Sequence, residues 1–193
     1  KYFYITRGGK LKEAYEGIEA ARSVGLTPIK INNVLIGGFN DDEIIDFVNL
    51  TKNEKMDIRF IEIMPMGQAV NWAVDNFVSN ELVLEKVKSL EKVKSSDKSS
   101  PAVYYKLPNA KGKVGLINSI SCKFCKECNR VRLTAEGKLK LCLHSNDEID
   151  LKNPLRKGEN IRELIEKSIM EKPEAHKLES GKYIFKNMNQ IGG

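Results

Sequence analysis

Four cysteines lie close together in the segment 122–144, which reads CKFCKECNRVRLTAEGKLKLCLH. Cys125 and Cys128 have the CxxC spacing that brings two thiolates to one metal centre, and Cys122 extends the run to CxxCxxC, as in ferredoxin-type runs. Cys142 returns on the far strand of a predicted hairpin whose turn is AEGK. The spacing therefore predicts a metal site with Cys125, Cys128 and Cys142 as ligands.

Three interpretations of these thiols remain open. The first is an iron–sulfur cluster, and the second is a structural zinc site built from four cysteines or from three of them plus His144. His144 lies two residues past Cys142, which places it on the same face of the predicted strand. The third is a set of unrelated buried thiols, although no cysteine lies outside residues 122–142. Spacing alone does not separate iron–sulfur from zinc.

Basic side chains accompany the cysteines. Arg130 and Arg132 are two residues apart and so are expected on one face of a strand. Paired guanidinium groups give forked donors that suit phosphate oxygens. The alternative is a solvated hairpin face, but a neighbouring metal site favours an anionic ligand.

Composition is ordinary for a globular chain of 193 residues, with 30% charged residues and a formal net charge of +6. The charge fits an anionic ligand as well as solubilising lysines. No stretch approaches the roughly 20 apolar residues that span a bilayer, so no membrane partner is predicted. We also find no secretory leader. Closely spaced cysteines in such a chain fit a reducing compartment, and we expect a cytoplasmic protein.

The first part of the chain alternates helix and strand. Apolar spacing predicts a helix over 10–24, strands over 28–36 and 57–64, and between the strands a helix capped by Asn40 or Asp41. This order is typical of a parallel sheet. Ligand sites on such sheets lie at the carboxyl ends of strands, which directs attention to Glu62 and Met64.

Lys30 and Asn32 share one face of the earlier predicted strand. A lysine that points into a sheet face is harder to attribute to packing, because burying an unpaired charge is costly.

The second part differs in pattern. We expect a loop around Trp72, a helix over 80–94 and a polar linker over 95–101. Short strands follow, and a helix over 161–171 has Asn160 as its N-cap.

Several motifs together resemble one known family. FCKECNRVRLTAEGKLKLCL is similar to the second cluster motif of the GTP 3′,8-cyclases, the radical S-adenosylmethionine enzymes that open molybdenum cofactor biosynthesis. The segments YITRGG, IKIN, GFNDDEI, RFIEIMPMG, VGLINSIS and the closing IGG also match in order. The resemblance covers almost the whole chain.

This resemblance implies an α/β fold, namely the C-terminal part of an incomplete (β/α) radical-SAM barrel followed by a smaller α+β domain that carries an iron–sulfur site. The corresponding domains are 1–74, the barrel part, and 75–193, the cluster and GTP-binding domain. A second, C-terminal [4Fe–4S] cluster then has Cys125, Cys128 and Cys142 as ligands.

The remaining site residues also follow from the resemblance. Lys30, Arg130 and Arg132 match GTP-binding positions, and Met64 matches a residue that contacts S-adenosylmethionine. The terminal Gly192 and Gly193 match a tail that reaches toward the active site.

Two features depart from the family pattern. The CxxxCxxC motif of the radical-generating, N-terminal [4Fe–4S] cluster is absent from these residues, and the sequence does not open with methionine. We therefore expect the C-terminal part of a longer enzyme, a lyase, which binds GTP but is inactive without the N-terminal part of the barrel. Cys122 is the second departure, and we do not expect it to be a ligand.

A cut barrel exposes a sheet edge, which favours pairing of two chains as a homodimer.

Two other functional classes compete with the enzyme. A zinc-stabilised nucleic-acid-binding module would need aromatic side chains to stack on bases, yet only Phe124 lies near the cysteines, so no nucleic acid partner is expected. A protein-interaction domain leaves Arg130, Arg132 and Lys30 unexplained.

Overall fold

The computed structural model describes residues 1–193 except 95, 96, 98, 123, 179, 180, 182, 188, 189, 192 and 193. The chain forms two compact units. The first comprises residues 1–63 and 76–121, and the second comprises residues 64–75 and 122–193. No helix among the described residues combines the length and the apolar character that crossing a membrane requires.

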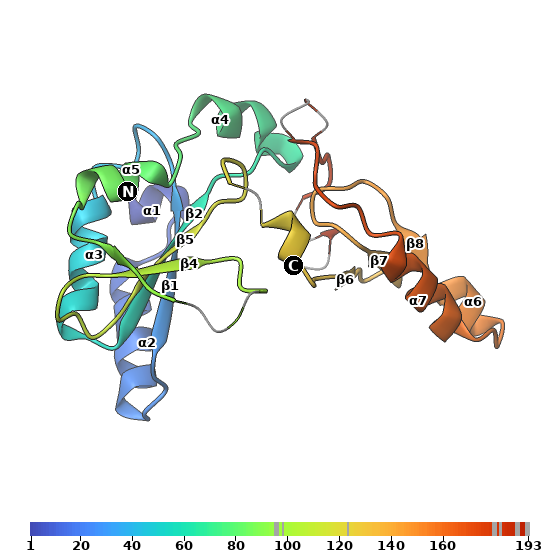
Figure 1. Ribbon diagram of the computed structural model, residues 1–193, viewed down its shortest axis with the longest axis horizontal. Helices are drawn as coiled ribbons and strands as arrows, with labels where there is room; N and C mark the ends of the chain where they lie inside the picture. The colour runs from blue at the N-terminus through green and yellow to red at the C-terminus, as the bar shows by residue number, and fades with distance from the viewer. Residues whose placement is uncertain are drawn as a thin grey trace. The chain divides into compact units, whose positions relative to one another are not determined.

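The first unit is built on a mixed five-stranded sheet with the strand order β1-β2-β5-β4-β3. Figure 1 labels β1, β2, β4 and β5 of this sheet. Its strands are β1 (Ile29–Leu35), β2 (Met56–Glu62), β3 (Glu91–Lys92), β4 (Val103–Lys106) and β5 (Val114–Ile117). β1, β2 and β5 are parallel, whereas β4 and β3 are added antiparallel. The parallel pair predicted from the first part of the sequence is confirmed.

Helices of the first unit are α1 (Tyr2–Ile5), α2 (Leu11–Ser23), α3 (Ile44–Asn53) and α5 (Glu81–Lys86). The alternate, inward side chains of the strands form one core with apolar side chains of α3 and α5. Its buried members are Leu35, Ile44, Val48, Met56, Ile58, Phe60, Val83, Leu107, Ala110, Val114 and Leu116. The sheet therefore has one covered face, and side chains of opposite parity line the other.

Three local predictions were wrong. Neither Asn40 nor Asp41 caps α3, whose N-cap is Glu43. The Asn40 side chain instead accepts from Ile36 N at 2.8 Å and donates to Val34 O at 2.9 Å, which closes the end of β1. The helix predicted over 80–94 ends at Lys86, and β3 follows it. Trp72 lies in a short helix, α4 (Val70–Asp75), rather than in a loop.

The second unit contains an antiparallel sheet with the order β6-β7-β8 and several short helices. Its elements are the 3₁₀ helices η1 (Gly67–Ala69) and η2 (Cys125–Glu127), the helices α4, α6 (Lys152–Arg156) and α7 (Ile161–Met170), and the strands β6 (Arg132–Leu133), β7 (Lys138–Lys140) and β8 (Ile149–Asp150).

The predicted hairpin of the second unit is confirmed. Arg132 pairs with Lys140, and Gly137 takes a positive φ of 79° in the turn, a conformation that glycine adopts without strain. Helix α7 is also confirmed, since the Asn160 side chain accepts from Arg162 N at 3.0 Å.

Glu62 ends β2 inside the first unit and is fully buried. Its carboxylate accepts the backbone N–H groups of Asn80 at 3.3 Å, Ile120 at 2.8 Å and Ser121 at 2.9 Å, and also the Ser121 hydroxyl. A buried carboxylate is tolerated only when such donors replace its lost water. Glu62 thus ties the start of α5 and the residues after β5 to the end of β2.

We predict that Glu62→Gln destabilises the protein by about 1–3 kcal/mol, because the amide NH₂ faces a backbone N–H and leaves it unpaired. Chemical denaturation measures this loss. The matched control is Glu85→Gln, because the Glu85 side chain is exposed on α5. Its free energy of unfolding is expected to stay within about 0.5 kcal/mol of the parent value. Equal stability of the two variants would show that the Glu62 network contributes nothing.

Candidate metal and anion site

All four cysteines belong to the second unit. Cys125 opens η2, and the Cys128 N–H closes it by donating to Cys125 O at 3.1 Å. All four cysteines are free thiols; Cys125, Cys128 and Cys142 are half-buried, whereas Cys122 is exposed. Burial thus separates Cys122 from the three cysteines that the sequence selected.

Cys142 lies two residues beyond the end of β7. Burial raises the pKa of its thiol, and the thiols of Cys125 and Cys128 raise it further. Within the described ranges no group of three or more His, Cys, Asp or Glu side chains is placed so that it could hold a metal ion. The donor set itself is chemically suited to an iron–sulfur cluster, because thiolates are the usual ligands of such clusters.

His144 is engaged with a neighbour other than the thiols. Its Nε2 lies 2.9 Å from Met64 Sδ, and its ring packs edge-on against His176 with centroids 4.7 Å apart. Burial first, and then the adjacent His176, lowers the pKa of His144 to about 4, so the ring is neutral at pH 7. The prediction that His144 shares a strand face with Cys142 was wrong, because β7 ends at Lys140.

The two arginines differ in setting. Arg132 is half-buried in β6, whereas Arg130 precedes the strand and is exposed. Behind them, Lys140 is buried, donates to the Ser145 carbonyl oxygen, and has its pKa lowered by burial. Both arginines thus lie in the chain between Cys128 and Cys142, one before β6 and one within it.

Lys30 belongs to the first unit, near the start of β1 and not at its carboxyl end. It is exposed together with Asn32, on the sheet face opposite the helix-covered core. Arg59 on β2 pairs with Asn32 and donates its Nε–H to the Asn32 Oδ1 at 2.8 Å. Sequence reasoning missed Arg59. The available signal is its place between two apolar strand residues, Ile58 and Phe60, which puts its side chain on the opposite face of β2.

The sequence directed attention to Glu62 as a ligand position, but its carboxylate is occupied by backbone donors. Met64 is half-buried beside His144 in the second unit. The predicted tail residues Gly192 and Gly193 lie outside the described residues.

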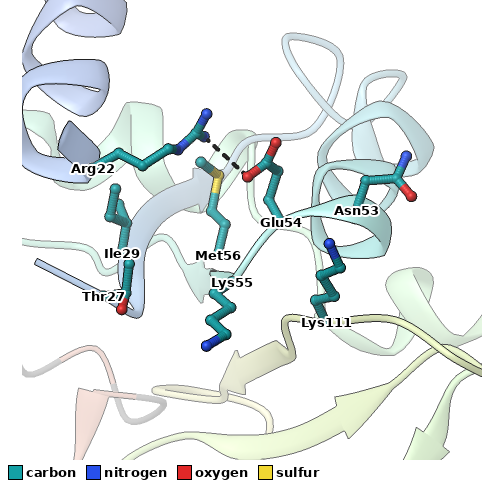
Figure 2. A pocket seen from close by; sticks show the side chains of 8 residues that line it. All are labelled: Arg22, Thr27, Ile29, Asn53, Glu54, Lys55, Met56 and Lys111. Carbon is teal, nitrogen blue, oxygen red and sulfur yellow. Dashed lines mark ion pairs between the residues drawn. The ribbon is translucent and has the colours of Figure 1, made fainter. Parts of the chain in front are cut away.

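A shallow pocket of about 240 Å³ lies at the opposite, amino-terminal end of β1 and β2 (Figure 2). Arg22 forms an ion pair with Glu54 at 3.4 Å across it. The lining residues are Arg22, Thr27, Ile29, Asn53, Glu54, Lys55, Met56 and Lys111. None of the sequence-predicted site residues is among them, so this pocket does not define the candidate site.

The known proteins to which the chain is similar carry one and the same name. The chain is 60% identical over 194 residues to a GTP 3′,8-cyclase of Peptoclostridium acidaminophilum, covering all of this chain and 60% of that protein. It is 52% identical over 196 residues to the GTP 3′,8-cyclase of Alkaliphilus oremlandii, with 100% and 61% covered. A Clostridium botulinum (strain Okra) protein of the same name is 46% identical over 191 residues, with 98% and 60% covered.

The chain thus spans about 60% of the length of these curated relatives. A family model described as Molybdenum Cofactor Synthesis C matches residues 56–178, which is more than half of the chain and includes all four cysteines. The chain belongs to this Molybdenum Cofactor Synthesis C family.

Proposed function

We propose that the chain is the C-terminal part of a GTP 3′,8-cyclase, a lyase that acts in the first step of molybdenum cofactor biosynthesis. The observation that carries the proposal is the set of three half-buried thiols, Cys125, Cys128 and Cys142, with Arg130 and Arg132 between the last two in the chain. Relatives that match the entire chain and carry this enzyme name support it.

Cys125, Cys128 and Cys142 are assigned as ligands of a [4Fe–4S] cluster. Three thiols leave one iron without a protein ligand, and when bound the cluster would supply that open position to the purine of GTP. Zinc is the less favoured metal for two reasons. His144 is turned to Met64, and Cys122 is exposed, so neither supplies an evident fourth protein ligand.

Arg130, Arg132 and Lys30 are assigned to the triphosphate of GTP. Guanidinium groups stay charged and bind phosphate through two parallel N–H donors, while the lysine acts as a point charge. Arg59 joins this group, because it lies on the same exposed sheet face as Lys30. Each of these cations would offset part of the negative charge of the triphosphate.

Met64 is assigned to S-adenosylmethionine, which it would contact in the longer protein. The reaction also needs the N-terminal [4Fe–4S] cluster, whose CxxxCxxC motif is not among these residues. We therefore propose that these 193 residues bind a cluster and GTP but do not cyclise GTP alone. Four free thiols fit a reducing cytoplasm.

The remaining part of the barrel is the proposed partner of the first unit. β1 is an edge strand of the sheet formed by the described residues. Large apolar side chains on and beside α1 and α2 are exposed, namely Tyr2, Phe3, Tyr4, Ile5, Leu11, Tyr15, Val24 and Leu26. An unpaired strand edge and an apolar surface of this size favour coverage by further chain.

The first prediction concerns the metal. After anaerobic reconstitution, Cys125→Ala or Cys128→Ala is expected to lose most of the bound iron and sulfide, whereas the matched Cys122→Ala is expected to retain them. Iron and sulfide analysis with electron paramagnetic resonance of the reduced protein measures this. Stoichiometric zinc without sulfide, or an equal loss in Cys122→Ala, would overturn the cluster assignment.

The second prediction concerns GTP. Arg130→Ala is expected to weaken GTP binding by about tenfold or more, because a charge-assisted bidentate contact contributes about 1.5–3 kcal/mol. Lys126→Ala, which removes an exposed cation of η2 in the same loop, is the control and should change affinity by less than about threefold. Calorimetric titration of the cluster-loaded protein gives both values. Similar losses in the two variants would indicate attraction by net charge alone.

A further inference from the structure

Lys172 contacts the loop that carries two of the cysteines and one arginine, although it is more than forty residues away in sequence. We refer to residues 124–130 as the cysteine loop. We propose that Lys172 is a positioning residue that clamps the cysteine loop and, through Cys128, raises the reduction potential of the bound cluster. The clamp stands on the geometry alone, whereas the effect on the cluster rests on the proposed function.

The base of the Lys172 side chain is fixed by helix α7. Lys172 follows the helix end, and its backbone N–H still donates to Ile169 O at 3.2 Å, while Pro173 comes next and ends the helical pattern. The helix begins at a side-chain cap on Asn160. The backbone of Lys172 is therefore held at the end of α7, and its side chain starts from a fixed position.

The ammonium group has three donors and three neighbours. Lys172 Nζ donates to Cys128 O at 2.7 Å and to Arg130 O at 2.7 Å, and it lies 3.5 Å from Cys128 Sγ, within hydrogen-bonding distance for sulfur. Lys172 is half-buried, and no carboxylate of a described residue forms an ion pair with it. Among the described residues, all side-chain hydrogen bonds of Lys172 thus go to the cysteine loop.

The two carbonyl groups fix the direction of the loop. Cys128 has an extended backbone with φ −75° and ψ 110°, and carbonyls two residues apart in such a segment point to the same side. One ammonium group that binds both carbonyls holds residues 128–130 in this conformation. The Cys128 thiol and the Arg130 side chain, which the proposed function assigns to cluster and GTP, are then held in one orientation.

A cation that donates a hydrogen bond to a sulfur ligand also changes the reduction potential of the cluster. Reduction adds negative charge to the cluster, and hydrogen bonds to its sulfurs together with the local net charge set its reduction potential. Lys172 near Cys128 Sγ stabilises the reduced form more than the oxidised form. Removing the positive charge of Lys172 should therefore lower the reduction potential. A substitution that keeps the charge should leave the reduction potential unchanged.

The test compares Lys172→Met, which keeps the stem without the charge, with Lys172→Arg, which keeps the charge. Lys167→Met is the matched control, because Lys167 is exposed on the same helix. Hydrogen exchange of the metal-free chain is measured at Glu127 and Cys128, whose N–H groups are bonded within η2. Exchange is expected to be several-fold faster in Lys172→Met, close to the parent in the other two variants, and unchanged within α7.

The second measurement is a redox titration of the reconstituted cluster followed by electron paramagnetic resonance. Lys172→Met is expected to favour the oxidised form by about tenfold, which is about 59 mV for a one-electron couple, and Lys172→Arg is expected to restore most of the shift. A merely structural role would alter cluster content without moving this potential.

The outcomes separate the clamp from the proposed function. Faster loop exchange in Lys172→Met supports the clamp even where no variant binds a cluster, a result that would reject the cluster assignment alone. Unchanged loop exchange, or the same change in Lys167→Met, overturns the clamp. A cluster that binds normally with the parent potential in Lys172→Met overturns the electrostatic half of the proposal.

Discussion

The buried carboxylate of Glu62 is the constraint on which the arrangement of the first unit depends. A carboxylate with no exposed surface needs several donors, and these come from chain segments that follow two different elements, at Asn80 and at 120–121. Satisfying one charge therefore fixes where the start of α5 and the end of the β5 segment lie relative to β2. Cys122 follows Ser121 directly in the chain, so the cysteine segment begins from a held residue.

Alternate side chains along the strands of the first unit point to opposite faces of the sheet, so that one face packs the core and the other carries polar residues. Side chains of one parity, such as Ile58 and Phe60, enter the core, and Phe60 meets Phe47 edge-on with ring centroids 6.3 Å apart. Side chains of the other parity, Lys30, Asn32 and Arg59, remain on the opposite face. Polar residues can therefore be changed for function on this face without opening a cavity in the core.

The second unit has less secondary structure and a smaller apolar core than the first. Its strands have two or three residues each, and its small cluster of Met66, Ile184 and Ile191 offers little apolar area. Order in the cysteine loop comes from directed polar contacts, including the three from Lys172. A thiol-bound metal group would add substantial stability to such a unit, since metal binding and folding are coupled when ligands come from separate segments.

Periodicity and turn chemistry were sufficient for much of the fold. Alternating strands around short connections predicted the parallel pair β1 and β2, and AEGK predicted the β6–β7 hairpin, because both signals are local. The helix predicted over 80–94 failed since its apolar spacing continues past Lys86, where pairing of β3 with β4 replaces the helix. Asn40 was misassigned because its acceptors and donors, at Val34 and Ile36, become available only when the end of β1 is formed.

For the candidate site, the residue types and spacing by themselves determined the three cysteines, the arginine pair and the family to which the chain belongs, since these are written in consecutive residues. Tertiary structure decided the rest. Only folding could turn His144 to Met64, place Arg59 beside Asn32 and bring Lys172 to Cys128. Each of these contacts joins residues distant in sequence, and no local pattern encodes the distance between such residues.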